Sequence, residues 1–244
     1  MNVLDLFSGI GGFSIGLERA GMHTVAFCDS EPFCRAVLAK HWPGVPCYDD
    51  VRTLTSSRLA ADGISVDVIC GGFPCQDIST AGKGAGLNGE RSGLWREYAR
   101  LIGEIRPRYV IVENVAALLY RGLSDVLGDL ASLGYDAEWH CIPASHIGAP
   151  HRRDRIWIVA YPNGSRWERS EKTGDDAKIR PQSRNQLITG CYRISWRTWE
   201  TEPNVGRVAN GVPARMDRLK SLGNAVVPQI PEIIGRAIMK YENP

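Results

Sequence analysis

The fold is already indicated near the N-terminus by NVLDLFSGIGG, which occupies residues 2–12. Residues 2–6 are a short apolar run, and a glycine-rich turn follows them. Residues 13–20 then have helical spacing, and Gly21 ends that pattern. A strand, a tight glycine turn and a helix in this order are typical of the first unit of an open α/β sheet. Glycines at the carboxyl end of such a strand let backbone amides approach a polar ligand closely.

The alternation of strand and helix patterns continues along the chain. We expect further strands at 24–28, 66–70, 109–112, 137–142 and 155–160, and helices at 31–41, 93–105, 124–133 and 231–241. Several of the strands are continuous Val/Ile runs, which are typical of parallel strands buried on both sides. The sequence therefore predicts an α/β fold with a mostly parallel sheet and helices on both faces.

Length and charge limit what kind of protein this is. The chain has 244 residues, of which 43% are hydrophobic, and 29 Lys and Arg balance 27 Asp and Glu to a net charge of +2. This fits one large domain or one domain with a small insertion. A nearly neutral chain is not a tail-driven nucleic-acid binder, so any such contact must come from local basic clusters.

No apolar run approaches the roughly 20 residues that span a bilayer. The N-terminus lacks the basic start of a signal peptide and has a strand pattern instead, so we expect a cytoplasmic protein that does not enter a membrane. The seven cysteines include no Cys-x-x-Cys, which predicts reduced thiols and no metal site.

Composition changes after Tyr161. Residues 162–203 contain few aliphatic residues but three tryptophans and many charges of both signs. We therefore divide the chain into a main domain at 1–160, a short loop-rich insertion at 161–206, and a segment at 207–244 that completes the main domain. Arginines in the insertion could contact phosphates and guanine edges; the alternative is a surface loop without a partner.

Acidic residues follow the early strands. Asp29 or Glu31, after the second strand, is suited to the hydroxyls of a ribose, and Asp50 could meet an adenine amino group. Each acid taken alone is as well explained as a carboxylate at a helix N-terminus. Together with the glycine turn, the acids favour a cofactor that contains adenosine.

A second informative stretch is VDVICGGFPCQDIS at residues 66–79. A buried strand runs straight into the glycine pair, which places Cys75 in a loop at the ligand edge of the sheet. A free thiol has a pKa of about 8.5 and needs amides or a guanidinium nearby to become a good nucleophile. We expect Cys75 to be reactive, whereas Cys28, Cys70 and Cys141 end or lie in strands and are expected to be buried structural residues.

Two further motifs carry charged groups to the same edge. Glu113 directly follows the apolar run at 109–112, and a carboxyl group there is expected to have a raised pKa and to hold a proton. The alternative is a carboxylate that caps the next helix. In the segment HRRDR at 151–155, alternate residues of an extended chain share a face. His151, Arg153 and Arg155 are therefore expected to point together toward a substrate, unless they form a solvated loop.

These motifs together resemble those of the DNA (cytosine-5)-methyltransferases, which use S-adenosylmethionine. The matching segments are the turn at 5–12, Phe-Pro-Cys-Gln at 73–76, Glu-Asn-Val at 113–115, Arg-x-Arg at 153–155 and Gly-Asn-Ala-Val at 223–226. The chain departs from the family pattern at His151, where glutamine is usual, and at Pro32, where a large side chain is common. The insertion is also shorter than the usual target-recognition region.

The resemblance implies a Rossmann-like S-adenosylmethionine methyltransferase fold and methyl transfer to C5 of cytosine in double-stranded DNA. A target base would be flipped out of the duplex. Cys75 would form a covalent bond to C6, Glu113 would bind the N3 edge, Arg155 would hold O2, and Arg153 would support these catalytic groups.

The resemblance also implies a set of cofactor contacts, with S-adenosylhomocysteine as the product. The residues are Phe7, Gly9, Ile10, Gly12, Glu31, Asp50, Pro74, Leu94, Asn224 and Ala225.

The resemblance also allows a cognate restriction endonuclease as a partner. We expect the protein to be a monomer. The alternatives are a transfer-RNA cytosine-5 methyltransferase of the same lineage, or a catalytically silent or split DNA-binding subunit.

Overall fold

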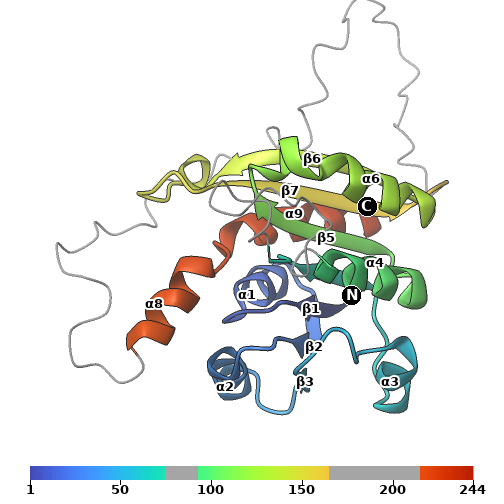
Figure 1. The fold of residues 1–244 in the computed structure, drawn as a ribbon, viewed down its shortest axis with the longest axis horizontal. Helices are drawn as coiled ribbons and strands as arrows, with labels where there is room; N and C mark the ends of the chain where they lie inside the picture. Colours follow the sequence, from blue (N-terminus) through green and yellow to red (C-terminus); the bar gives the residue numbers. More distant parts are fainter. Residues whose placement is uncertain (75–92, 165–214, 244) are drawn as a thin grey trace, which may run out of the picture.

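The computed structural model describes residues 1–74, 93–164 and 215–243. Within these residues seven strands form one sheet in the order β3-β2-β1-β4-β5-β7-β6 (Figure 1). The strands are β1 (Asn2–Leu6), β2 (His23–Cys28), β3 (Cys47–Tyr48), β4 (Val68–Gly71), β5 (Tyr109–Val115), β6 (Tyr135–Pro143) and β7 (Asp154–Pro162). The first five pair in parallel, and β7 runs antiparallel to both β5 and β6.

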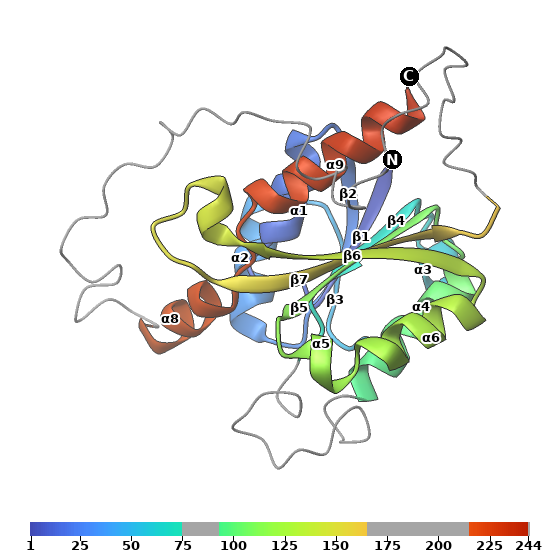
Figure 2. The same ribbon diagram turned by 90° about the horizontal axis from the view of Figure 1, so that it is seen from above.

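Helices cover both faces of the sheet, as predicted. They are α1 (Gly12–Arg19), α2 (Pro32–His41), α3 (Ser56–Ala61), α4 (Gly93–Ile105), α5 (Leu118–Arg121), α6 (Leu123–Ser132), α8 (Arg215–Asn224) and α9 (Gln229–Glu242), with a 3-10 turn, η2, at Ala144–Ile147. Figure 2 shows the sheet nearly edge-on, with α1 and α9 on one side and α4 and α6 on the other. In both views α8 projects from the side of the molecule.

Two apolar cores hold these layers together. Trp95 and Tyr98 of α4 pack in the core on one face of the sheet, and Leu17 of α1 packs with Ile234 and Ile238 of α9 in the core on the other. The α1–α9 contact needs glycine, because a Cβ on Gly235 would lie only 2.8 Å from the Cβ of Ala20. Burial of these large side chains supplies the main stabilisation and fixes the strand ends in place.

Most predicted elements are present with ends shifted by a few residues. The largest shift is at β5, which extends through Glu113 to Val115 because β7 continues to pair with it, Glu113 lying opposite Trp157. Glu113 is therefore inside the strand, and the prediction that it directly follows the strand is wrong. Helix α8 was not predicted; it is polar, and its apolar residues Met216 and Leu222 are exposed.

The cysteine predictions have mixed outcomes. Cys28 and Cys70 are buried, as expected, and both carry free thiols. Cys141 is also free but exposed, so its predicted burial is wrong. The physical reason is its place on β6, an edge strand of the sheet, where only the ends of the strand are buried. A position in a strand does not guarantee cover at the edge of a sheet.

The predicted insertion at 161–206 lies outside the described residues except for its first four positions, 161–164. Strand β7 ends at Pro162, next to the expected boundary. Among the described residues, no helix combines the length and apolar character that a membrane crossing requires.

Candidate active site

Glu113 is the central ionisable group at the carboxyl end of β5. Its side chain is nearly buried, and its Oε1 lies 2.9 Å from Nε of Arg155 on the neighbouring strand β7. Burial raises the pKa of this carboxyl group, although the positive charges of Arg155 and Arg153 oppose the rise. The predicted raised pKa is thus confirmed in direction, and the carboxylate pairs with an arginine across the sheet.

The chain leaving β4 passes directly against Glu113. A Cβ on Gly72 would lie 2.7 Å from Oε2 of Glu113, so a side chain there would displace the Glu113 carboxyl group. Nδ2 of Asn114 donates a 3.1 Å hydrogen bond to the carbonyl oxygen of Phe73, which fastens the end of β5 to the same segment. Pro74 is the last described residue of this segment, and Cys75 lies outside the described residues.

The two arginines of the third motif are placed by different means. Arg155 is on β7, but Arg153 precedes the strand and has φ +35°, in the left-handed region. The segment at 151–155 is therefore not extended throughout. The prediction that its alternate residues share one face because the segment is extended is wrong. Nη1 of Arg153 donates a 2.7 Å hydrogen bond to the carbonyl oxygen of Gly223. Its guanidinium still lies in the electrostatic field of Glu113 and Arg155.

The glycine turn after β1 is held on several sides. The backbone N–H of Gly9 donates to Oδ2 of Asp29 at 2.7 Å, and Gly9 has φ +55° with open space where a Cβ would be. Gly12 is tightly packed, because a Cβ there would lie 2.6 Å from the carbonyl oxygen of Val226. The turn thus lies against the closing segment at 223–226 and leaves one of its glycines open to a ligand.

The three candidate acids have distinct environments. Asp29 also accepts a 2.8 Å hydrogen bond from the N–H of Glu31, so its two oxygens bind backbone groups. Oε2 of Glu31 lies 2.7 Å from Nζ of Lys220 on α8. Asp50 accepts a hydrogen bond from Nε of Arg52 at 3.0 Å, which lowers the pKa of Asp50. Sequence reasoning missed Lys220, because no apolar pattern marked α8.

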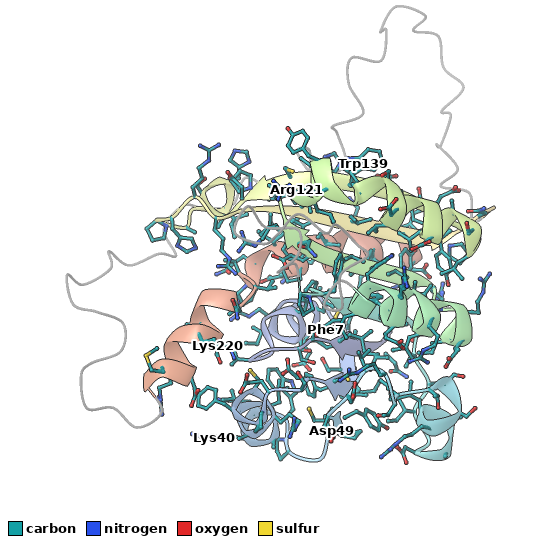
Figure 3. The ribbon with its side chains drawn as sticks, viewed as in Figure 1. Phe7, Lys40, Asp49, Arg121, Trp139 and Lys220 are labelled. Atoms are coloured by element: carbon teal, nitrogen blue, oxygen red, sulfur yellow. The ribbon has the colours of Figure 1, made fainter. Side chains whose placement is uncertain are left out.

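The remaining candidate cofactor residues surround this region. Phe7 has φ +53° and its ring stacks with Tyr98 at a centroid distance of 6.3 Å. Figure 3 shows Phe7 near the middle of the molecule and Lys220 to one side of it on α8. The other described candidates are the partly buried Ile10, Pro74, Leu94 and Ala225 and the exposed Asn224.

These residues suit an adenosine-containing cofactor on grounds of chemistry. An open glycine turn, a partly buried aromatic ring and a partly exposed carboxylate after β2 are groups that suit such a ligand. The described residues contain no cluster of three or more His, Cys, Asp or Glu side chains that could hold a metal ion.

Comparison with known proteins identifies the family. The model of the C-5 cytosine-specific DNA methylases matches residues 1–204. The chain belongs to this family. The chain also has the Rossmann-like fold of S-adenosylmethionine-dependent methyltransferases, as predicted. It aligns with a putative DNA modification methyltransferase encoded within an Escherichia coli prophage at a TM-score of 0.60 and 25% identity, over 80% of this chain and 56% of that one.

Curated relatives of this chain are type II methyltransferases. It is 37% identical over 168 residues to M2.BsuMI of Bacillus subtilis, which covers 66% of this chain and 42% of the relative. It is 31% identical over 219 residues to M.DsaV of Dactylococcopsis salina, which covers 84% of this chain and 59% of the relative. The chain thus spans about half the length of the curated relatives that it matches.

Proposed function

We propose that this methylase transfers a methyl group from S-adenosylmethionine to C5 of cytosine in double-stranded DNA. The observation that carries the proposal is the arrangement around Glu113. A nearly buried carboxyl group with a raised pKa, paired with Arg155, lies against Gly72, three residues before Cys75. This places a proton donor beside the segment that precedes a thiol.

The chemistry follows from these groups. The Sγ of Cys75, as a thiolate that has lost its proton to solvent, bonds to C6 of the cytosine while Glu113 supplies a proton to N3, so that electron density collects at C5. The bound cofactor would supply an electrophilic methyl group to C5 and leave as S-adenosylhomocysteine. A base then removes the C5 proton, the bond from Sγ to C6 breaks, and the proton on N3 is released. Burial raises the pKa of Glu113 above its ordinary value, which favours the protonated form that this step needs.

Arg155 and Arg153 support this step from β7 and the segment before it. After Glu113 gives up its proton, the carboxylate remains paired with the guanidinium of Arg155 at 2.9 Å, which stabilises the charge. We assign Arg155 also to the O2 edge of the base. The C6 and C5 atoms of a stacked base are not accessible to a protein nucleophile, so the target cytosine must leave the duplex.

We place the cofactor between the glycine turn and the closing segment. Its contacts would come from Phe7, Gly9, Ile10, Gly12, Glu31, Asp50, Pro74, Leu94, Asn224 and Ala225. The ion pair of Glu31 with Lys220 is largely exposed, with side-chain exposures of 39% and 62%, and pairs of this kind are weak. Ribose hydroxyls can therefore replace Lys220 at the Glu31 carboxylate.

The names of the relatives extend the proposal to partners. Because they are type II methyltransferases, we propose a cognate restriction endonuclease as the functional partner of this methylase. The recognition role of residues 161–206, the monomeric state and the cytoplasmic location stay predictions.

The proposal is tested by incubating the full chain with tritiated S-adenosylmethionine and either duplex genomic DNA or transfer RNA. Label in DNA, absent with the E113Q variant, is the expected result. Label in transfer RNA alone would replace DNA by RNA as the substrate. Label in neither would show that this chain does not act by itself.

A further inference from the structure

The backbone of Arg153 is in an uncommon conformation. Its φ of +35° lies in the left-handed region, which is unfavourable for a residue with a Cβ. A hydrogen bond from the N–H of Ala144 to the carbonyl oxygen of Arg153 holds it there at 3.3 Å. Such a conformation persists only where the surrounding contacts require it, so the direction of this side chain is imposed by the fold.

The guanidinium of Arg153 contacts the closing segment and lies within electrostatic range of the catalytic pair Glu113 and Arg155. On one side Nη1 donates to the carbonyl oxygen of Gly223 at 2.7 Å. On the other side the charges of Arg155 and Glu113 act on it, and its pKa is lowered by burial first and by Arg155 second. The fold therefore keeps a cation here although burial and a like charge oppose it.

Gly223 belongs to the segment that we assign to the cofactor. Asn224 and Ala225 follow it directly, and Val226 packs against Gly12 of the glycine turn. A ligand bound between the turn and this segment would contact the residues next to Gly223, whose carbonyl oxygen accepts the hydrogen bond from Arg153.

We propose that Arg153 is a positioning residue that couples occupation of the cofactor site to the state of the catalytic acid. The inference rests on the proposed function, because it needs the cofactor at the closing segment. Binding there fixes the carbonyl oxygen of Gly223, which fixes the guanidinium of Arg153 and so stabilises the arrangement of Glu113 with Arg155. Binding of the methyl donor thus orders Glu113 and Arg155 for the target base. By the same coupling, binding of the base strengthens binding of the methyl donor.

The experiment is hydrogen–deuterium exchange of the full chain with and without S-adenosylhomocysteine, alongside calorimetric binding of the same compound. Wild type is compared with R153M and with R152M, a matched control, since Arg152 is exposed and pairs only locally with Asp154. In wild type and R152M, we expect the ligand to slow exchange at 224–228 and, by at least about fivefold, at 113–118.

In R153M, protection at 224–228 should remain while the effect at 113–118 falls below about twofold. Equal protection of 113–118 in R153M, or none in wild type despite binding, would overturn the coupling and leave the cofactor assignment standing. Failure of wild type to bind the compound would overturn both. If R153M does not fold, R153K is tested in its place. Its ammonium group keeps the charge but lacks the planar donor geometry of a guanidinium, so at least half of the coupling should be lost.

Discussion

Replacing Asp5 by asparagine should remove one proton's share of the pH dependence of stability between about pH 4 and pH 8. Asp5 is fully buried on β1 (0% exposed). Its Oδ2 accepts a 2.7 Å hydrogen bond from Oγ of Ser14, whereas Oδ1 has no hydrogen-bond partner in the described part of the chain. Burial raises the pKa of Asp5 from 3.8 to about 8.

The sign follows from the direction of this shift. The folded state keeps a proton on Asp5 that the unfolded state releases, so the free energy of unfolding falls as the pH rises from about 4 to about 8. One such proton gives a slope of about 1.4 kcal/mol per pH unit. The contribution is complete below the unfolded pKa and is lost once the pH passes the folded pKa.

The assay is urea unfolding of wild type, D5N and the exposed control D136N at several pH values from 5 to 8. D5N should start lower at pH 5 by about 1–3 kcal/mol, because its amide has a donor without a partner, but should then follow a flatter profile. D136N should keep the wild-type slope. If D5N keeps it too, Asp5 is ionised in the folded protein and the burial argument is wrong.

Two further substitutions test the site. G72A places a methyl group against Glu113. Overpacking of about 1–3 kcal/mol would displace the carboxyl group of Glu113, so turnover should fall at least about tenfold. The helix variant G128A, whose added methyl group has open space, should leave turnover unchanged in the same methyl-transfer assay; equal losses would refute the contact. K220M frees Glu31 and should tighten binding of S-adenosylhomocysteine by less than about fivefold in calorimetry; a tenfold weakening would contradict the assigned competition.

Much of the fold was predictable because its signals are local. Continuous apolar strands, the glycine turn and the amphipathic helix α4, whose bounds at Gly93–Ile105 agree with the prediction, all carry their pattern in a few neighbouring residues. Helix α8 could not be found in this way. Its contacts to distant elements include single polar ones, such as Arg153 with Gly223, and these leave no periodic trace.

The site was predictable at the level of motifs but not of geometry. The raised pKa of Glu113 follows from a carboxyl group at a buried strand and was expected. The positive φ of Arg153 depends on contacts with Ala144 and Gly223 that lie far along the chain, so an argument from alternation could not anticipate it. The exposure of Cys141 depends on which strand forms the edge of the sheet, which is a property of topology.

The proposed mechanism requires Cys75 to attack the base beside Glu113. Its most direct test is covalent capture on a plasmid amplified with 5-fluorodeoxycytidine triphosphate, because fluorine at C5 cannot leave as a proton and the bond from Sγ to C6 cannot break. In the presence of S-adenosylmethionine we predict a denaturant-stable protein–DNA adduct that peptide mass spectrometry maps to Cys75 and that C75S lacks. An adduct on another cysteine, or methylation of ordinary DNA by C75S, would contradict the account.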